Sequence, residues 1–296
     1  MKFSLITTTL GRTHELARLL KSVDAQTCRD FEVIVVDQNS RDLLDPILAP
    51  FRDRFPLSHI RSARGASRGR NAGLARARGE IITFPDDDCW YPPRVLEDAA
   101  TLFAVHPEWD GLSGRPGGTP RWPERSGRIG RWNVWKRAIE WTMFLRRELV
   151  DHVGNLNENI GPGAGSLYGA GEGTEYLIRA LAMNFRLVYQ PSIEVFHETP
   201  ELEFEVHMEK SRRYAMGQGR VLRLGRYPAW YAAYHWMRPL GGAALGLAKR
   251  QPKQSLVALA VVQGIISGYS MAGDNVQPAA APAMELPARR RQMSLQ

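Results

Sequence analysis

Three adjacent carboxylates, Asp86, Asp87 and Asp88, follow a short apolar run at residues 81–84. A β-branched apolar run of this length is typical of a buried strand, so we expect the carboxylates at its carboxyl end. Neighbouring carboxylates repel one another, and a hard divalent cation with oxygen ligands relieves that repulsion. The same residues could also form a solvated acidic turn before a helix that starts near residues 92–93. The acidic run therefore predicts a cation site that needs support from the rest of the chain.

Strands and helices alternate over the first 105 residues. Residues 3–8 and 31–36 are apolar and β-branched, and residues 14–23 carry leucines at helical spacing with Thr13 as a candidate N-cap. Two further helices are expected at residues 70–78 and 95–105. This alternation predicts an α/β fold with a doubly wound, mostly parallel sheet. Ligands of such sheets bind beyond the carboxyl ends of the strands, so Asp37 and the acidic run should share one crevice.

The segment from residue 110 to residue 197 is less regular. Residues 110–135 are rich in Gly, Pro, Arg and Trp without a clear period, which predicts a loop region that lines the site. A helical period returns at residues 172–182, after a Gly-rich stretch. Residues 185–189 and 193–196 then predict two short strands.

Composition narrows the class of protein and its partners. The chain has 296 residues, of which 44% are hydrophobic and 24% charged, as in ordinary globular proteins. Its formal net charge of +8 is compatible with nucleic acid, anionic lipid or a phosphorylated substrate. Cys28 and Cys89 have neither disulfide nor zinc-site spacing, which favours a reducing compartment. Because the apolar start is too short for a signal-peptide core, we expect a cytoplasmic protein.

The C-terminal third is basic and aromatic. No acidic residue occurs from residue 210 to residue 253, and two apolar runs follow the aromatic side chains at residues 240–248 and 256–266. Neither run reaches the roughly 20 residues of a spanning helix, so we predict amphipathic helices on the cytoplasmic face of the inner membrane. The alternative is a docked helical hairpin that completes the core. Residues 273–296 are predicted to be a disordered tail.

Four segments in a fixed order resemble a known family. They are Asp37 after the second strand, Arg70-Asn71-Ala72-Gly73, the acidic run, and Glu172 with the helix that it begins. Together they resemble family 2 glycosyltransferases with the GT-A fold, of the bacterial cell-surface polysaccharide type, over residues 3–226. The resemblance implies a UDP-, GDP- or dTDP-sugar donor, a divalent cation (Mn²⁺ or Mg²⁺), and transfer with inversion at the anomeric carbon.

The resemblance also implies roles for individual residues. Asp88 would be the main metal ligand, with Asp86 as the second and His197 as the third. Asp87 would orient the loop or the sugar. The nucleotide-sugar site would comprise the following residues, in chain order: Thr7, Thr8, Thr9, Asp37, Arg70, Asn71, Asp86 and Asp87.

The general base is the point at which this chain departs from the family pattern. Most members take the acceptor's proton with the aspartate of a Glu-Asp pair, whereas this chain has Glu172 followed by Gly173. We predict Glu172 as the base, with Glu175 as the alternative. Both could instead simply complement the dipole of the helix that they begin.

These observations predict a metal-dependent inverting glycosyltransferase with a lipid-linked or polysaccharide acceptor and no nucleic-acid partner. Its organisation would be a GT-A transferase domain over residues 1–226, a membrane-contacting helical region over 227–272 and the tail over 273–296. Trp132, Trp135 and Trp141 are candidates to stack on an acceptor sugar. Two alternatives stay open: a nucleotidyltransferase, and a degenerate transferase fold used as a basic scaffold for membranes or nucleic acid.

Overall fold

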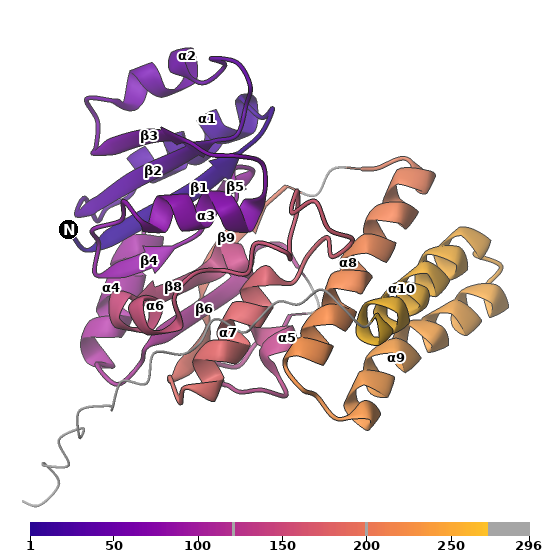
Figure 1. Ribbon diagram of the computed structural model, residues 1–296. Coiled ribbons are helices and arrows are strands. Elements are labelled where there is room, and N and C mark those ends of the chain that lie inside the picture. The colour runs from indigo at the N-terminus through magenta and orange to yellow at the C-terminus, as the bar shows by residue number, and fades with distance from the viewer. Residues whose placement is uncertain (120–121, 199–200, 272–296) are drawn as a thin grey trace, which may run out of the picture.

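A single mixed sheet organises the first two thirds of the chain (Figure 1). The computed structural model describes residues 1–119, 122–198 and 201–271. Within these residues the strands are β1 (Phe3–Thr9), β2 (Phe31–Asp37), β3 (Leu57–Arg61), β4 (Ile81–Thr83), β5 (Cys89–Trp90), β6 (Gly111–Pro116), β7 (Gly127–Ile129), β8 (Met143–Arg146) and β9 (Leu187–His197).

The sheet is parallel in one half and mixed in the other. Its order is β3-β2-β1-β4-β8-β6-β9-β5, with β7 also paired to β9. The strands β3, β2, β1 and β4 are parallel, as the alternation of elements predicted. The strand β8 then runs antiparallel to both β4 and β6, while β6 and β9 are parallel. The carboxyl ends of β1, β2 and β4 therefore meet at one edge, where Asp37 and the acidic run lie.

Helices cover both faces of the sheet and extend beyond it (Figure 1). They are α1 (His14–Asp24), α2 (Asp45–Leu48), α3 (Ala66–Leu74), α4 (Val95–Val105), α5 (Val134–Arg137), α6 (Arg147–Val153), α7 (Glu172–Ala182), α8 (Phe204–Leu224), α9 (Ala229–Ala248) and α10 (Pro252–Ser270). Two 3₁₀ turns, η1 (Ala49–Phe51) and η2 (Glu140–Thr142), join longer elements.

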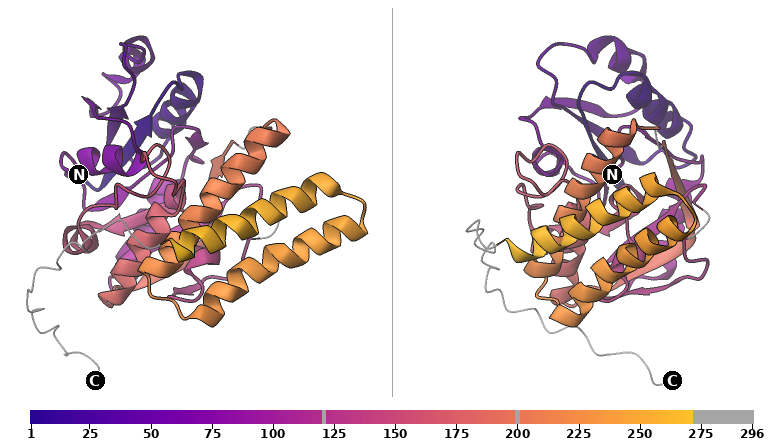
Figure 2. Two further views of the ribbon diagram at one scale, coloured as in Figure 1. Left: turned by 45° about the vertical axis from the view of Figure 1, so that its right-hand side comes forward. Right: turned by 90° about the vertical axis from the view of Figure 1, so that its right-hand side faces the viewer.

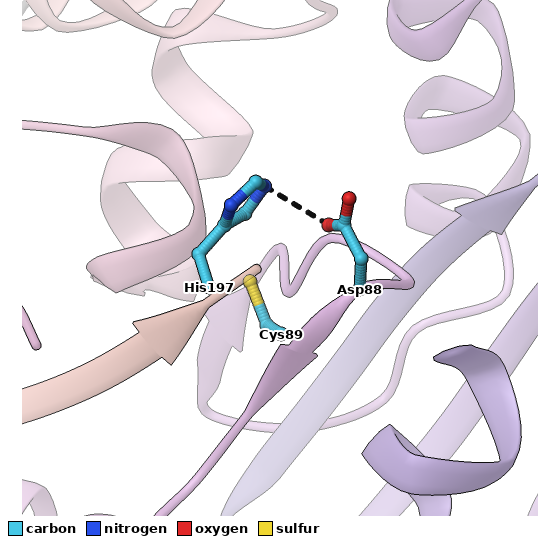
Figure 3. A group of neighbouring side chains, drawn as sticks. All are labelled: Asp88, Cys89 and His197. Atoms are coloured by element: carbon cyan, nitrogen blue, oxygen red, sulfur yellow. Dashed lines mark ion pairs between the residues drawn. The ribbon is translucent and has the colours of Figure 1, made fainter. Parts of the chain in front are cut away.

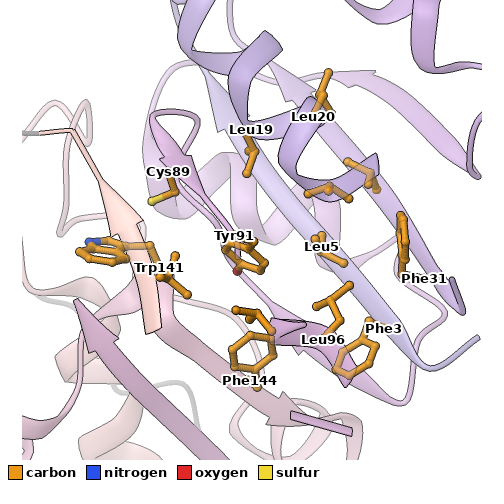
Figure 4. Close-up of a cluster of buried hydrophobic side chains, with 14 of the residues drawn as sticks. Phe3, Leu5, Leu19, Leu20, Phe31, Cys89, Tyr91, Leu96, Trp141 and Phe144 are labelled. Carbon is orange, nitrogen blue, oxygen red and sulfur yellow. The ribbon is translucent and has the colours of Figure 1, made fainter. Parts of the chain in front are cut away.

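The core forms because neighbouring side chains of a strand point to opposite faces of the sheet. Leu5 packs against α1 and α4 on one face, where Leu19, Leu20 and Phe31 also lie (Figure 4). Ile6, its neighbour in β1, joins a second cluster on the other face with residues of α6 and α7. Burial of both faces explains why these strands read as continuous apolar runs.

The helices α9 and α10 form a hairpin that packs against α8 (Figure 2). Glycines let α10 approach α8 closely: a Cβ atom on Gly268 would lie 2.0 Å from the carbonyl oxygen of Met216. Ile265 of α10 and Leu222 of α8 are buried in the small core between these helices. The expected helices at 240–248 and 256–266 are thus parts of the longer helices α9 and α10, which pack as a hairpin. No helix in the described residues is long and apolar enough to cross a membrane.

Several local expectations differ from the structure. Thr13 lies at the N-cap position of α1, but its side chain makes no capping hydrogen bond. The helix expected at residues 70–78 is α3, which begins at Ala66 because Gly65, with φ of 133°, ends the preceding loop. The two strands expected after residue 185 are one strand, β9, with a register irregularity against β6. The predicted loop at 110–135 contains β6 and β7, and the predicted tail at 273–296 lies outside the described residues.

Close packing of α10 on α8 predicts that Gly268→Ala destabilises the protein. The added methyl group would overlap backbone that cannot move freely, so we expect a loss of about 1–3 kcal/mol in the free energy of unfolding. Gly242→Ala in α9 is the matched control, since a Cβ there has no heavy atom within 4 Å. That control should be neutral or gain up to about 1 kcal/mol. Equal denaturant midpoints for the two variants, measured by tryptophan fluorescence, would contradict this packing.

Candidate functional site

A polar cavity of about 570 Å³ opens at the carboxyl ends of β1 and β4. The acidic run forms one wall, and residues of α3, η2, α7 and α8 complete it. The residues that matter below are Thr8, Thr9, Arg12, Gln38, Arg70, Asp86, Asp87, Asp88, Glu140, Trp141, Glu172, His197, Lys210 and Tyr214. The sheet topology thus creates the crevice that the sequence predicted at this edge.

Two arginines neutralise the acidic run from opposite sides. Nη1 of Arg12, in the loop after β1, contacts Oδ1 of Asp87 at 2.7 Å and also bonds Asp88. Nη2 of Arg70, in α3, donates to Oδ1 of Asp86 at 2.8 Å. Burial raises the pKa of Asp87 to about 6, although Arg12 opposes that shift. The structure therefore pairs the three carboxylates with fixed cationic side chains.

Asp88 and His197 face one another because their strands pair (Figure 3). In the antiparallel pair of β5 and β9, Cys89 lies opposite His197, which brings Asp88 alongside. Nε2 of His197 lies 3.0 Å from Oδ1 of Asp88. Burial alone would raise the pKa of Asp88 and lower that of His197. The contact between the carboxylate and the imidazole has the opposite effect on each pKa, and it outweighs burial. The pKa of Asp88 is consequently lowered and that of His197 raised.

This pair fits a hard divalent cation. The 3.0 Å between Asp88 Oδ1 and His197 Nε2 is the distance of a direct hydrogen bond, and it also equals the roughly 3 Å between two adjacent ligands of an octahedral cation, which would take the place of the shared proton. The thiol of Cys89 lies within 4.8 Å of both atoms, but burial raises its pKa well above the usual value. A protonated thiol is a poor ligand. The donor set therefore suits a metal held by a carboxylate and an imidazole.

Arg70 also joins the acidic run to α7. Its side chain is almost fully buried, and Nη1 donates to Oε1 of Glu172 at 2.8 Å. Gly171 adopts a φ of 106° at the N-cap of α7, which turns the chain so that Glu172 begins the helix pointing inward. Burial and then the charge of Glu140 raise the pKa of Glu172, while Arg70 lowers it. Glu172 is 4% exposed, so its carboxylate is held at the base of the cavity.

The structure brings together most of the predicted site residues. Thr8 and Thr9 of β1 line the cavity, as do Arg70, the three aspartates, Glu172 and His197. Trp141, predicted as an acceptor contact, also lines it and stacks on His197 with 5.2 Å between ring centroids.

Four predicted residues lie elsewhere, and three of them have polar structural partners. Thr7 is buried within the sheet. Asp37 is also fully buried and accepts hydrogen bonds from the backbone and side chain of Asn39. Asn71 holds the loop at Leu156, donating to its carbonyl and accepting from its amide. The carboxylate of Glu175 is bound by Nε and Nη2 of Arg179 and does not line the cavity.

Arg12, Gln38 and Glu140 are among the cavity residues that the sequence analysis did not assign. Arg12 lies only three residues beyond β1, a position from which a cation could have been expected to reach the acidic run. Gln38 bridges the loop after β3 by donating to Ala63 and Gly65 carbonyls. Glu140 carried no recognisable pattern, because its place in the cavity depends on the contact between η2, just before β8, and the first turn of α7.

Comparison with known proteins identifies the class and then the family. Among solved structures, the mannosyltransferase PcManGT from Pyrobaculum calidifontis, in complex with GDP-Man and Mn²⁺, superposes with a TM-score of 0.63 at 17% identity, covering 90% of this chain and 86% of that one. Such a likeness shows the GT-A fold. The model of glycosyl transferase family 2 matches residues 4–168. The chain therefore belongs to glycosyl transferase family 2.

Individual relatives match over shorter segments. Poly(ribitol-phosphate) β-N-acetylglucosaminyltransferase TarS of Staphylococcus aureus is 32% identical over 111 residues, or 36% of this chain and 19% of TarS. TarS residues 1–349 in complex with UDP-GlcNAc superpose with a TM-score of 0.58 at 19% identity, covering 91% and 90% of the two chains. GalNAc(5)-diNAcBac-PP-undecaprenol β-1,3-glucosyltransferase of Campylobacter jejuni is 34% identical over 91 residues, 29% of either chain. The sequence matches thus span less than a third of either relative.

Burial of the Arg70 and Glu172 pair predicts a large cost when one partner is removed. Arg70→Met would leave the carboxylate of Glu172 buried without its cation, which should lower the free energy of unfolding by about 3–5 kcal/mol. The double variant Arg70→Met/Glu172→Met should recover most of that loss. The exposed Arg76 provides the control, and Arg76→Met should change stability by less than about 0.5 kcal/mol. Guanidinium unfolding that finds the double variant no more stable than Arg70→Met would refute the pairing.

Proposed function

We propose that this protein transfers a sugar from a nucleoside diphosphate sugar to a hydroxyl acceptor, with inversion at the anomeric carbon and with the help of a divalent cation. The observation that carries the proposal is the cavity in which Asp88, His197 and the two arginines surround one polar space at the sheet edge. Membership of glycosyl transferase family 2 supports the same reaction class. UDP-GlcNAc and GDP-Man in the related structures support a nucleotide-sugar donor.

In this proposal different residues of the cavity bind the cation, the nucleotide and the leaving diphosphate. Asp88 and His197 would hold the cation, with Asp86 nearby, and the cation would neutralise charge on the donor's diphosphate. Thr8, Thr9 and Gln38 border the space for the nucleotide. Arg12 and Lys210 place positive charge where the leaving diphosphate gains negative charge, which lowers the barrier to its departure.

Two aromatic side chains, Trp141 and Tyr214, line the cavity. Trp141 is mostly buried and stacks on His197, so the more exposed Tyr214 is the ring whose face can stack on the apolar face of an acceptor sugar. Burial raises the pKa of Tyr214, so its hydroxyl stays protonated and can donate a hydrogen bond. A saccharide acceptor, free or lipid-linked, is the substrate class that this lining favours.

The α9–α10 hairpin supports a lipid-linked acceptor. The apolar side chains of Trp230, Tyr234, Met237 and Leu245 recur at helical spacing along α9 and are exposed. Arg238, Lys249, Arg250 and Lys253 lie in the same hairpin, which contains no acidic residue. A surface that combines exposed aromatic and aliphatic groups with positive charge is suited to an anionic lipid surface. We therefore include peripheral contact with the cytoplasmic face of a membrane in the proposal.

Nucleotide binding tests the donor site. Calorimetric titration of UDP, GDP, dTDP and CDP, each with and without Mn²⁺, should find one nucleotide that binds more tightly with the metal. Asp88→Ala should weaken that metal-dependent binding by about 100-fold, because even residues that only support a metal ligand are worth 10–100-fold. The exposed Asp53→Ala is the control and should bind as the wild type does.

Two outcomes of this titration and its companion assays would overturn the proposal. No nucleotide binding, together with salt-sensitive binding of nucleic acid, would favour a degenerate scaffold. Release of pyrophosphate from a nucleoside triphosphate and a sugar phosphate would identify a nucleotidyltransferase.

Vesicle binding tests whether the α9–α10 hairpin contacts a membrane. We expect the protein to bind vesicles of phosphatidylcholine with phosphatidylglycerol more tightly than phosphatidylcholine alone, and less tightly as salt rises. Leu245 is 55% exposed on this face of α9, and Leu245→Glu should weaken binding by about tenfold or more, since burying a leucine is worth about 1.5–3 kcal/mol. Val105→Glu, at a site 62% exposed in α4, is the matched control. Equal partition of both variants in a sedimentation assay would rule out the hairpin as the contact.

A further inference from the structure

Gly173 stands where the family pattern places an aspartate, and the space of its missing side chain is filled by another carboxylate. An ideal Cβ built on Gly173 would lie 2.1 Å from Cγ of Glu140 and 2.7 Å from its Oε1. The backbone N–H of Gly173 donates to that same Oε1 at 3.0 Å. Glu140 is 33 residues earlier in the chain and approaches from η2. A carboxylate from a different element thus occupies the position next to Glu172.

The backbone that carries Glu140 is held firmly. Thr142, in the same 3₁₀ turn, is fully buried and bonds the carbonyl oxygens of Gly114 and Ile139. Trp141 packs in the main core and stacks on His197. The carboxylate itself is anchored by the first turn of α7. A group held this way keeps a fixed position relative to the candidate metal ligands, as a catalytic side chain must.

Glu140 is also the accessible carboxylate of the three near the start of α7. It is only partly buried and lines the cavity beside Trp141, whereas Glu172 is enclosed and bonded to Arg70. Glu175 bonds Arg179 instead of lining the cavity. Oε2 of Glu140 accepts no hydrogen bond from the described residues, so it is available to a hydroxyl group in the cavity. Geometry therefore separates the enclosed, Arg-bound carboxylate from the one that can meet an acceptor.

We propose that Glu140 is the general base of the transfer, and that Gly173 is the small residue that makes room for it. The assignment rests on the proposed function. The acceptor's hydroxyl proton moves to the carboxylate of Glu140 as the acceptor oxygen forms its bond to the anomeric carbon. The bond between that carbon and the diphosphate oxygen breaks, and its electron pair leaves with the nucleoside diphosphate. Glu172 then acts as a positioning residue that holds Arg70 against Asp86.

The test compares binding with turnover in single variants. The donor is the sugar form of the nucleotide selected by calorimetry, and the acceptors are octyl glycosides, a polyprenyl diphosphate-linked sugar, and water. Glu140→Gln should keep the donor's Kd and lower kcat by about 10²- to 10⁴-fold, the usual contribution of a general base. Glu148→Gln, at an exposed site in α6, should behave as the wild type does.

A double variant tests whether the position of the carboxylate determines the rate. Gly173→Asp alone should lose activity, because its side chain collides with Glu140. Glu140→Gly/Gly173→Asp moves the carboxylate from η2 to α7 and should regain at least tenfold over Glu140→Gln. Restored turnover would show that the position of the carboxylate, and not the stability of η2, determines the rate.

Two results would overturn the assignment in distinguishable ways. Wild-type kcat in Glu140→Gln, or a loss confined to Glu172→Gln with Arg70 still in place by thermal stability, would leave the transferase proposal intact and return the base to Glu172. A wild-type protein that binds donor yet releases no nucleoside diphosphate with any acceptor would contradict the proposed function and the assignment of the base with it.

Discussion

Charge compensation beneath the cavity is the constraint on which the rest of the site depends. Arg70 is buried between Asp86 and Glu172, which come from segments 16 and 102 residues away. A buried charge without a partner costs several kcal/mol, so α3, the acidic loop and α7 are stable only when they are assembled together. Asp87 and Asp88 are buried as well, and Arg12 in the loop after β1 is their cationic partner. The site is therefore formed by the tertiary fold, and its ion pairs set the positions of the elements that carry it.

Strand pairing fixes the other half of the cavity. The strand β9 pairs with both β6 and β5, which places His197 against Asp88 and under Trp141. The turn η2, just before β8, lies against the first turn of α7, where Glu140 accepts a hydrogen bond from the N–H of Gly173. Candidate metal ligands and the proposed base thus belong to one rigid framework. Spacing between the reacting groups then depends on sheet register, which a one-residue slip would destroy.

The sequence predicted the parallel half of the fold and the acidic side of the cavity. Continuous apolar strands mark both buried faces, and the acidic run after β4 necessarily falls at a carboxyl end of the sheet. The resemblance to family 2 glycosyltransferases added His197, whose neighbour Asp88 is 109 positions away in the chain, a contact that local patterns do not reveal. Helical periods at 95–105 and 172–182 gave the bounds of α4 and α7, because amphipathic helices carry a strong local signal.

By itself, then, the sequence determined the elements whose patterns are local: buried strands, amphipathic helices, and an acidic loop that requires cations. Tertiary structure alone decided which cationic side chains pair with the acidic loop and which carboxylates face the cavity. Asp37 and Glu175 end in structural contacts, while Arg12 and Glu140 enter the site. The physical reason is that an ion pair or hydrogen bond depends on distance in space, and the antiparallel turn of the chain at β8 joins residues that no period or spacing connects. Gly173 illustrates this: its sequence position suggests a missing group, and only the fold shows what fills the space.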